Sequence, residues 1–227
     1  MKLIRRRALL LAMLGSPLLP GLALSQPNPA NWQEFLERMY RLAQFHANDS
    51  CTPASIAEQG LQSLQQLDVD SAGFRDAVEN AWESGNRFWL WQRLANENGL
   101  QGGILQVDRG HDVPLHDHPG ATGMLRVLTG TLEVWHFNDI TGNDKDDSVL
   151  QRVSRRTLQA GDTAVLLPEQ GNIHALRALS PQCSMLDFFI PPYKRSQRNW
   201  YLPAERGWHD KQNIHCERIA DNDFFLS

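Results

Sequence analysis

Residues 114–130, PLHDHPGATGMLRVLTG, decide the predicted fold and site. They place His116 and His118 two residues apart in a segment that is predicted to be extended. Side chains at positions i and i+2 of a strand point to the same face, so the two imidazoles are expected to converge. Such a pair needs only one more ligand to hold a metal ion. An HxH pair also arises by chance, so the prediction depends on the residues around it.

Glycines bound two segments that together predict a metal site. The first runs from Gly110 through the histidine pair to Gly130, and the second, GDTAVLLPEQGNIH, ends at His174. The turn-forming residues of the second segment are Gly161, Pro168 and Gly171. Glycine suits turns that bring strands close together, and proline ends a strand. His174 is therefore the predicted third ligand, contributed by a neighbouring strand.

From about residue 86 the sequence becomes a series of short apolar or alternating runs, such as RFWLWQRL, MLRVLTGTLEVWHF and CSMLDFFI. Turn-forming residues bound each run, which is typical of an antiparallel β-sandwich or barrel. The two glycine-bounded segments resemble the paired motifs of the cupin superfamily, a double-stranded β-helix or jelly roll. This resemblance assigns the metal-ligand positions to His116, His118 and His174.

The part of the chain before these runs is predicted to be helical. Apolar side chains recur there at three- and four-residue spacing, which indicates amphipathic helices. The predicted helices span residues 28–50, 53–67 and 71–84. We therefore expect a mainly β protein in which an N-terminal helical segment, residues 26–84, packs on a cupin domain, residues 85–227. No linker separates the two parts.

Composition limits the possible partners. The chain has 227 residues, which is enough for one domain with a full core. Hydrophobic residues make up 41% and charged residues 21%, as in an ordinary globular protein. The formal net charge is -4, and no basic stripe is present. Nucleic acid is therefore not an expected partner, and a monomer is expected.

The first 25 residues predict a secretory signal peptide. A basic start, MKLIRRR, precedes an apolar run that ends in small residues at 23–25. Pro17 and Pro20 break the run, which is too short for a membrane span. Arg6 and Arg7 resemble a twin-arginine export signal. We expect an exported, periplasmic protein with no membrane span after cleavage; an uncleaved anchor is the alternative.

Three cysteines, Cys51, Cys183 and Cys216, permit at most one intramolecular disulfide. The expected compartment is oxidising, and Cys51 with Cys216 is the possible pair because each lies outside the central region. Cys183 is expected to pack within a strand. No CxxC motif is present, so a cysteine zinc site is not indicated.

The predicted metal site lacks an acidic ligand. Most metal cupins place a glutamate between the HxH pair and the closing glycine, but Thr122 or Gly123 stands there. A neutral three-histidine set leaves the full charge on a divalent metal and up to three open coordination positions. Such a site can accept a thiolate, a second donor from the same substrate and dioxygen. Iron(II) suits imidazole ligands and can pass electrons to dioxygen, whereas zinc cannot, so oxidation of a thiol to a sulfinate is the predicted chemistry.

Three segments resemble the cysteamine dioxygenase and plant cysteine oxidase family of thiol dioxygenases: LHDHPGATGMLRVLTGT, GNIHALRAL and SMLDFFIPPY. The resemblance covers roughly residues 90–205, and the GML after DHPG is closer to the cysteamine dioxygenase branch. It implies an iron(II) enzyme that inserts both atoms of dioxygen into a thiol and releases a sulfinic acid. It implies cysteamine or an N-terminal cysteine as the substrate.

The same resemblance carries two catalytic positions onto Asp187 and Tyr193. A carboxylate there can bind the substrate ammonium or water, and a phenol can donate a hydrogen bond at the metal site. The structural alternative is a buried hydrogen-bonded pair that anchors the turn at Pro191 and Pro192. The family's tail element, an arginine followed by cysteine and tyrosines, is only partly kept in residues 198–201 (RNWY), which lack the cysteine. A cysteine–tyrosine crosslink at that position is therefore not expected.

The remaining polar residues have no predicted role in the site. His111, His136, His209 and His215 lack a partner at ligand spacing; His111 is nearest the site in sequence and is therefore the expected exception. Arg126 could reach a substrate carboxylate, but the family resembled does not rely on such a contact, so Arg126 is expected to be a solvated strand residue. Two other functions stay open: a cupin that holds another metal for a different conversion, and a non-enzymatic exported binding module. A His174→Ala substitution should abolish iron binding in the dioxygenase and leave the binding module nearly intact.

Overall fold

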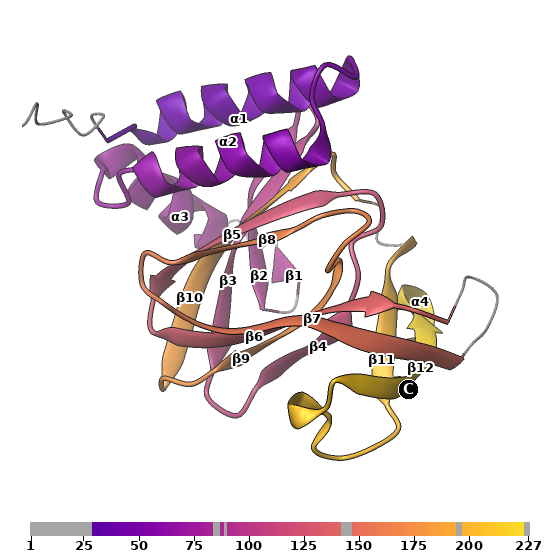
Figure 1. The fold of residues 1–227 in the computed structure, drawn as a ribbon. Helices are drawn as coiled ribbons and strands as arrows, with labels where there is room; N and C mark the ends of the chain where they lie inside the picture. The colour runs from indigo at the N-terminus through magenta and orange to yellow at the C-terminus, as the bar shows by residue number, and fades with distance from the viewer. Residues whose placement is uncertain (1–28, 84–86, 89, 142–146, 194–196, 225–227) are drawn as a thin grey trace, which may run out of the picture.

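Helices and β-strands form separate layers in the computed structural model of the chain (Figure 1). The structure describes residues 29–224 except 84–86, 89, 142–146 and 194–196. The predicted signal peptide at residues 1–25 therefore lies outside the described residues. Within the described ranges, no helix is both long and apolar enough to cross a bilayer.

The three predicted helices are confirmed, with ends that differ by a few residues. They are α1 (Trp32–Ala47), α2 (Pro53–Gln66) and α3 (Ala72–Glu83). At the start of α1, Asn31 Oδ1 accepts a hydrogen bond from the backbone N–H of Glu34 at 3.0 Å. The Glu34 carboxylate accepts one from the backbone N–H of Asn31 at 3.2 Å. These reciprocal bonds satisfy two amide groups that the helix itself leaves without partners.

Antiparallel strands make up most of the described chain after α3. The first sheet contains β1 (Arg87–Phe88), β2 (Trp91–Glu97), β3 (Leu100–Asp108), β5 (Thr122–Thr129), β8 (Thr163–Leu166) and β10 (Gln182–Ile190). The second contains β4 (Asp112–His116), β6 (Thr131–Asp139), β7 (Asp147–Gln159), β9 (Ile173–Ala178), β11 (Asn199–Pro203) and β12 (Asn213–Ala220). A 3₁₀ turn (Trp208–Asp210) precedes β12, and the short helix α4 (Asp221–Phe224) follows it.

The order of the strands is that of a jelly roll. The first sheet runs β1-β2-β3-β10-β5-β8, and the second runs β11-β12-β7-β6-β9-β4. Strands β11 and β4 also pair with each other, so the second sheet closes on itself. Buried side chains from both sheets share one core, including Leu105 and Val127 from the first and Val134 and Leu176 from the second. The predicted fold class is confirmed: a mainly β cupin jelly roll with an N-terminal helical segment.

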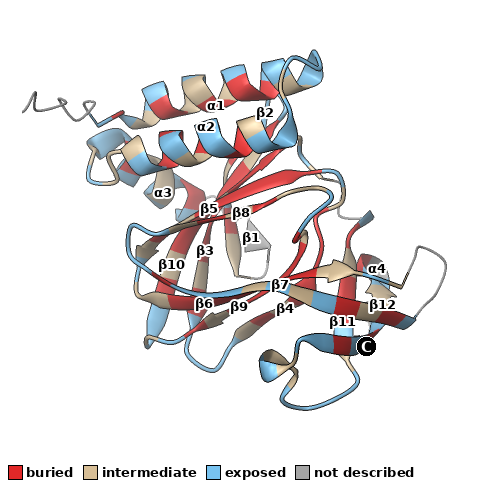
Figure 2. Cartoon of the chain, in the orientation of Figure 1, coloured by how far each residue is buried: buried red, intermediate tan, exposed pale blue. Residues whose placement is uncertain are grey.

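The helices cover the outer face of the first sheet, whose strands are buried beneath them (Figure 2). Phe35 of α1 meets Phe188 of β10 with ring centroids 5.2 Å apart. A glycine makes this contact possible, because a Cβ at Gly102 of β3 would lie 2.1 Å from the Phe188 ring. The outer face therefore belongs to the helix-packing core, and the inner face is left to line the site.

Arg126 joins this helical layer to the sheet, which corrects the expectation that it is a solvated strand residue. Its guanidinium Nη1 donates to the carbonyl oxygens of Leu64 at 2.5 Å and Leu67 at 2.9 Å. These carbonyls lie at the C-terminal end of α2, where helical carbonyls have no partner within the helix and the helix dipole favours a cation. Arg126 therefore acts as a C-terminal cap supplied by another element.

Replacing Arg126 by alanine should lower the free energy of unfolding by about 1–3 kcal/mol, because two helix-end carbonyls lose a charged donor. The matched control is Arg156→Ala, which removes an exposed arginine from β7 and should change stability by less than about 0.5 kcal/mol. Urea unfolding followed by far-ultraviolet circular dichroism measures both. Equal stability of the two variants would contradict the capping role.

The cysteines are free in the structure. Cys51 packs against the helical core, whereas Cys216 belongs to the core around β11 and β12, so the possible bridge between them is not formed. Cys183 is fully buried within the jelly roll, as expected, and burial raises the pKa of its thiol to about 11.

Candidate metal centre

Three histidines from two separate segments meet in the jelly roll. His116 ends β4 and lies directly opposite His174 of β9 in the strand register. His118 follows two residues later, with its ring centroid 4.8 Å from that of His116 and 5.1 Å from that of His174. One ligand nitrogen from each ring can be chosen so that all lie within 4.8 Å of one another, and all three residues are buried. The structure thus brings together the three predicted ligands.

His118 lies just beyond the end of β4 and begins a turn, although the sequence predicts a continuous extended segment. Strand β4 ends at His116, and the His118 carbonyl accepts a hydrogen bond from the backbone N–H of Ala121 at 3.1 Å. Pro119 and Gly120 occupy the two central positions, and Gly120 has a φ of +74°. This is the residue order of a type II turn, which needs a glycine where φ is positive. The DHPG sequence therefore turns the chain immediately after the second histidine.

Asn172 holds both segments together. Its side-chain Oδ1 accepts from the backbone N–H of His118 at 2.6 Å, and its Nδ2 donates to the His118 carbonyl at 3.1 Å. The backbone carbonyl of Asn172 lies 3.2 Å from Nδ1 of His174. One residue of the GNIH segment thus fixes the backbone of one candidate ligand and the ring of another. The sequence pattern predicts a role for His174 of this segment and none for Asn172.

The hydrogen bonds leave the ring nitrogens that a metal needs. Nδ1 of His116 lies 2.8 Å from the carbonyl oxygen of Pro114. Nδ1 of His174 lies 3.2 Å from the carbonyl oxygen of Asn172. A carbonyl can only accept, so each Nδ1 carries the proton and each Nε2 keeps its lone pair. Both ring nitrogens of His118 are buried without a hydrogen-bond partner among the described residues. A metal ion would satisfy one of these two orphaned nitrogens, so the residues fit a metal.

Burial also keeps the three imidazoles neutral. Desolvation, reinforced by the charge of Arg198, lowers the pKa of His116 to about 3. Desolvation and the neighbouring histidines lower the pKa of His118 and of His174 well below the usual value. Neutral imidazole is the ligating form of histidine, so the site is ready for a cation without first losing protons.

A fourth histidine extends the row across the sheet, which the sequence did not predict. His136 of β6 lies opposite His174 in the register, with ring centroids 6.3 Å apart. Its Nδ1 lies 2.9 Å from the hydroxyl of Ser154, and desolvation lowers its pKa to about 4. His111, the residue expected to be the exception, is instead exposed between β3 and β4. Strand register, which single-sequence spacing does not contain, would have been needed to find His136.

Asp117, between the two HxH histidines, fastens β4 to the C-terminal part of the chain. Its Oδ1 accepts from the backbone N–H of Asn199 at 2.7 Å. Its Oδ2 accepts from the Asn199 side-chain amide at 2.8 Å and from the Tyr201 hydroxyl at 3.1 Å. Asn199 stands where the family resemblance places a cysteine, so a cysteine–tyrosine crosslink cannot form through this position. Tyr201 instead takes part in the hydrogen-bonded network of Asp117.

The histidines open into a pocket of about 110 Å³ between the two sheets. Its lining residues are Trp91, Arg93, Gln101, Leu105, Val113, His116, His118, His174, Leu176, Asp187, Tyr193, Arg198 and Trp200. Asp187 lies mid-strand in β10, and its carboxyl group forms no hydrogen bond with any described residue; burial raises its pKa to about 8. The Tyr193 ring lies 4.3 Å from that of His118. Both predicted catalytic residues thus line the pocket, but the hydrogen-bonded pair proposed as their structural alternative is absent between these two described side chains.

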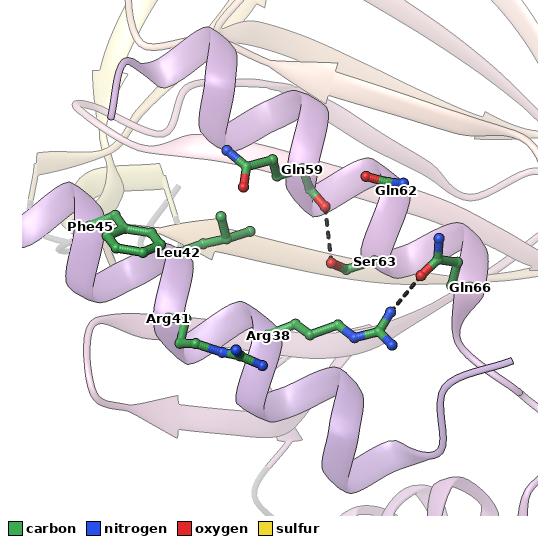
Figure 3. Close-up of a pocket in the computed structure, with 8 residues that line it drawn as sticks. All are labelled: Arg38, Arg41, Leu42, Phe45, Gln59, Gln62, Ser63 and Gln66. Carbon is green, nitrogen blue, oxygen red and sulfur yellow. Dashed lines mark hydrogen bonds between the residues drawn. The ribbon is translucent and has the colours of Figure 1, made fainter. Parts of the chain in front are cut away.

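A larger hollow, of about 330 Å³, lies between α1 and α2 and is open to solvent (Figure 3). Its polar lining includes Arg38, which donates to the Gln66 side chain, and Ser63, which donates to the Gln59 carbonyl. None of its described lining residues is a histidine, cysteine or carboxylate. The smaller pocket therefore holds the groups that can perform chemistry, and size alone would select the wrong one.

A family model described as PCO_ADO matches residues 63–217, which is more than half of the chain. The chain belongs to this family. The PCO_ADO match begins inside α2 and ends within β12, so it contains all three histidines together with Asp187 and Tyr193.

Curated relatives carry names that agree with this family. The chain is 27% identical over 124 residues to 2-aminoethanethiol dioxygenase of Mus musculus, which covers 45% of this chain and 48% of the mouse protein. It is 32% identical over 97 residues to plant cysteine oxidase 1 of Arabidopsis thaliana, covering 40% of this chain and 32% of the plant protein. This chain therefore spans about half, or less, of the length of these relatives.

Solved structures include a protein from Klebsiella pneumoniae with a double-stranded β-helix domain. It is 19% identical and covers 44% of this chain and 75% of the Klebsiella chain, with a TM-score of 0.35.

Removing the Asn172 side chain should weaken metal binding by about 10–100-fold, the usual effect of losing a group that orients metal ligands. Asn172→Ala frees the backbone of His118 while all three imidazoles remain. Anaerobic titration of the metal-free protein with iron(II) measures the dissociation constant. Asn213→Ala, at an exposed position of β12, is the control. Wild-type affinity in Asn172→Ala would show that the turn alone positions His118.

Proposed function

We propose that the protein is a non-haem iron(II) thiol dioxygenase that oxidises an aminothiol or an N-terminal cysteine to the sulfinic acid with dioxygen. The observation that carries this proposal is the neutral three-histidine cluster at the base of a pocket in a chain of the PCO_ADO family. The overall reaction is balanced, because RSH and O2 together contain every atom of RSO2H.

The absence of an acidic ligand supports this choice. Within the described part of the chain, the cluster of candidate ligands contains three histidines and no carboxylate. Thr122, at the position where other metal cupins have an acid, is buried, and its neighbour Gly123 has no side chain. Three neutral ligands leave the charge of a divalent ion uncompensated, which favours an anionic substrate group such as a thiolate.

His116, His118 and His174 would hold the iron, which supplies one-electron chemistry with dioxygen when bound. Leu105, Val113 and Leu176 form apolar parts of the wall and limit the access of water.

Asp187 and Tyr193 would act on the substrate from the pocket wall. The Asp187 carboxyl has no competing partner among the described residues, so it is available to receive the ammonium group of an aminothiol. The Tyr193 ring lines the same pocket, 4.3 Å from the His118 ring, and a phenol can donate a hydrogen bond to a ligand there.

Purification without oxygen, loading with iron(II) and incubation with cysteamine, cysteine and N-terminal-cysteine peptides test the proposal. The expected result is consumption of dioxygen and a gain of two oxygen atoms in one thiol, measured by mass spectrometry. Absence of any sulfinate with all three substrate types would contradict it. Tight retention of a redox-inert metal by protein isolated from its native compartment would favour another metal-dependent conversion.

We also propose that the chain is exported to the periplasm by a twin-arginine route, since that route carries folded proteins and iron could be loaded before export. The basic and apolar segments of residues 1–25 support this proposal. N-terminal sequencing of the protein from a periplasmic fraction is the measurement; recovery only in the cytoplasm with an intact N-terminus would contradict export.

A further inference from the structure

One wall of the pocket, formed by β2 and β3, carries polar groups that have no role in the proposed reaction. Strands β2 and β3 contribute Trp91, Arg93 and Gln101 to this wall. Arg93 pairs with Gly103 of β3 in the strand register, and Gly103 pairs with Asp187 of β10. Side chains of directly opposed residues share a face of the sheet, so Arg93 and Asp187 lie on the same face, one on each side of Gly103.

Arg93 differs from the other arginine of the pocket. The buried Arg198 donates to the carboxylate of Asp221, so its charge is compensated inside the protein. The Arg93 side chain is exposed at the pocket edge and forms no hydrogen bond or ion pair with any described residue. It is therefore the cation of this wall that is available to a ligand.

Trp91 supplies a second donor beside it. Its indole lies over Gly103, where a Cβ would come within 2.5 Å of the indole nitrogen. The Nε1–H is buried and has no hydrogen-bond partner among the described residues. Buried donors in native proteins nearly always have an acceptor, so this one indicates an acceptor that a ligand or a water supplies. The Gln101 amide adds a further donor to the same wall.

A carboxylate matches this set of donors. It offers two oxygens that accept several hydrogen bonds and pairs well with a guanidinium. Neighbouring strands lie about 4.8 Å apart, so the β2 and β10 backbones flanking Gly103 are separated by roughly 10 Å. The thiol at the histidines, an ammonium at Asp187 and a carboxylate at Arg93 can therefore occupy different parts of one small pocket.

We propose that Arg93 is a specificity-determining residue that selects aminothiols carrying a carboxylate, with Trp91 donating to the same group. This inference rests on the proposed thiol dioxygenase function and names the substrate class of that site. The carboxylate is either the α-carboxylate of free cysteine or an acidic side chain that follows an N-terminal cysteine. Cysteamine has the thiol and the amine without the carboxylate, so it serves as the internal reference.

The test compares wild type with Arg93→Gln, which keeps a polar side chain and removes the charge. The substrates are cysteamine, cysteine and the peptides Cys-Asp-Gly and Cys-Asn-Gly. Loss of one charge-assisted hydrogen bond should raise KM about 10–100-fold for the carboxylate-bearing substrate, with KM for cysteamine unchanged. A selective effect on cysteine identifies the α-carboxylate, and a selective effect on Cys-Asp-Gly over Cys-Asn-Gly identifies the side chain. Arg93→Lys should recover part of the affinity.

Anaerobic calorimetry on the metal-loaded protein gives a second readout that needs no turnover. Wild type should bind the carboxylate-bearing thiol more tightly than cysteamine, and Arg93→Gln should remove this difference. Arg75→Ala, on the exposed side of α3, is the control and should retain it. Equal effects of Arg93→Gln on cysteamine and on the carboxylate-bearing thiols, or no effect on either, would overturn the inference. A wild-type protein that oxidises no thiol contradicts the proposed function instead, and the binding measurement still tests Arg93.

Discussion

Replacing His174 by alanine should abolish iron binding and the formation of sulfinate. The ring supplies one of the three candidate ligands that the described residues bring together, and two imidazoles rarely retain a labile divalent ion. We expect the iron(II) dissociation constant to rise by at least about 100-fold, which is beyond the effect of losing a group that only orients a ligand. Anaerobic metal titration and mass spectrometry of the thiol product measure the two losses separately.

The control for this prediction is His111→Ala. His111 lies in the same sequence region but is exposed, so its removal should leave both iron affinity and product formation at wild-type levels. Thermal unfolding of the metal-free His174→Ala protein distinguishes loss of a ligand from loss of the fold. A folded variant that binds iron as wild type does would contradict the metal centre, and a folded variant that binds iron but forms no product would assign His174 to catalysis alone.

The features that could be predicted from sequence are those that depend on residues close together in the chain. The DHPG segment contains both a ligand and the proline–glycine pair that turns the chain after it, and each signal depends on neighbours in sequence. The same holds for the helix starts, where the capping residues lie within one turn of each other. His174 was found because a glycine-bounded segment resembles the second motif of a known fold.

Contacts set by strand register and by docking of helices on the sheet were missed. His136 meets His174 across two strands, and the 37 residues between them carry no signal of this pairing. Arg126 has the alternating context of a surface strand residue, and only the position of α2 turns it into a helix cap. Arg93 and Asp187 share a face across Gly103 for the same reason. Such pairings depend on which strands are neighbours, and the sequence of one chain contains that information only through the complete fold.

Asp187→Asn should lower catalytic turnover without lowering the stability of the protein. Burial without a hydrogen-bond partner among the described residues destabilises the ionised carboxyl and raises its pKa to about 8. Asparagine has nearly the same shape and cannot ionise. We therefore expect the metal-free variant to be at least as stable as wild type at pH 8, whereas its turnover of cysteamine should fall by about 100-fold or more.

The pH dependence follows from the direction of the shift. The unfolded chain releases the Asp187 proton near pH 4, while the folded protein keeps it until about pH 8. Between these values the folded state binds more protons, so raising the pH lowers the free energy of unfolding by up to about 1.4 kcal/mol per pH unit. The Asp187 contribution is complete below pH 4 and is lost as the pH rises through about 8. Asp187→Asn should lack this part of the slope.

Urea unfolding of the metal-free proteins at several pH values between 4 and 9 measures the difference. The stability curves of wild type and Asp187→Asn should lie closest at low pH and diverge as the pH rises, with the variant above wild type. Metal-free protein is required, since a bound cation would stabilise a nearby carboxylate and lower its pKa. Parallel curves would show that Asp187 is solvated like an ordinary surface acid and would contradict its burial in the pocket.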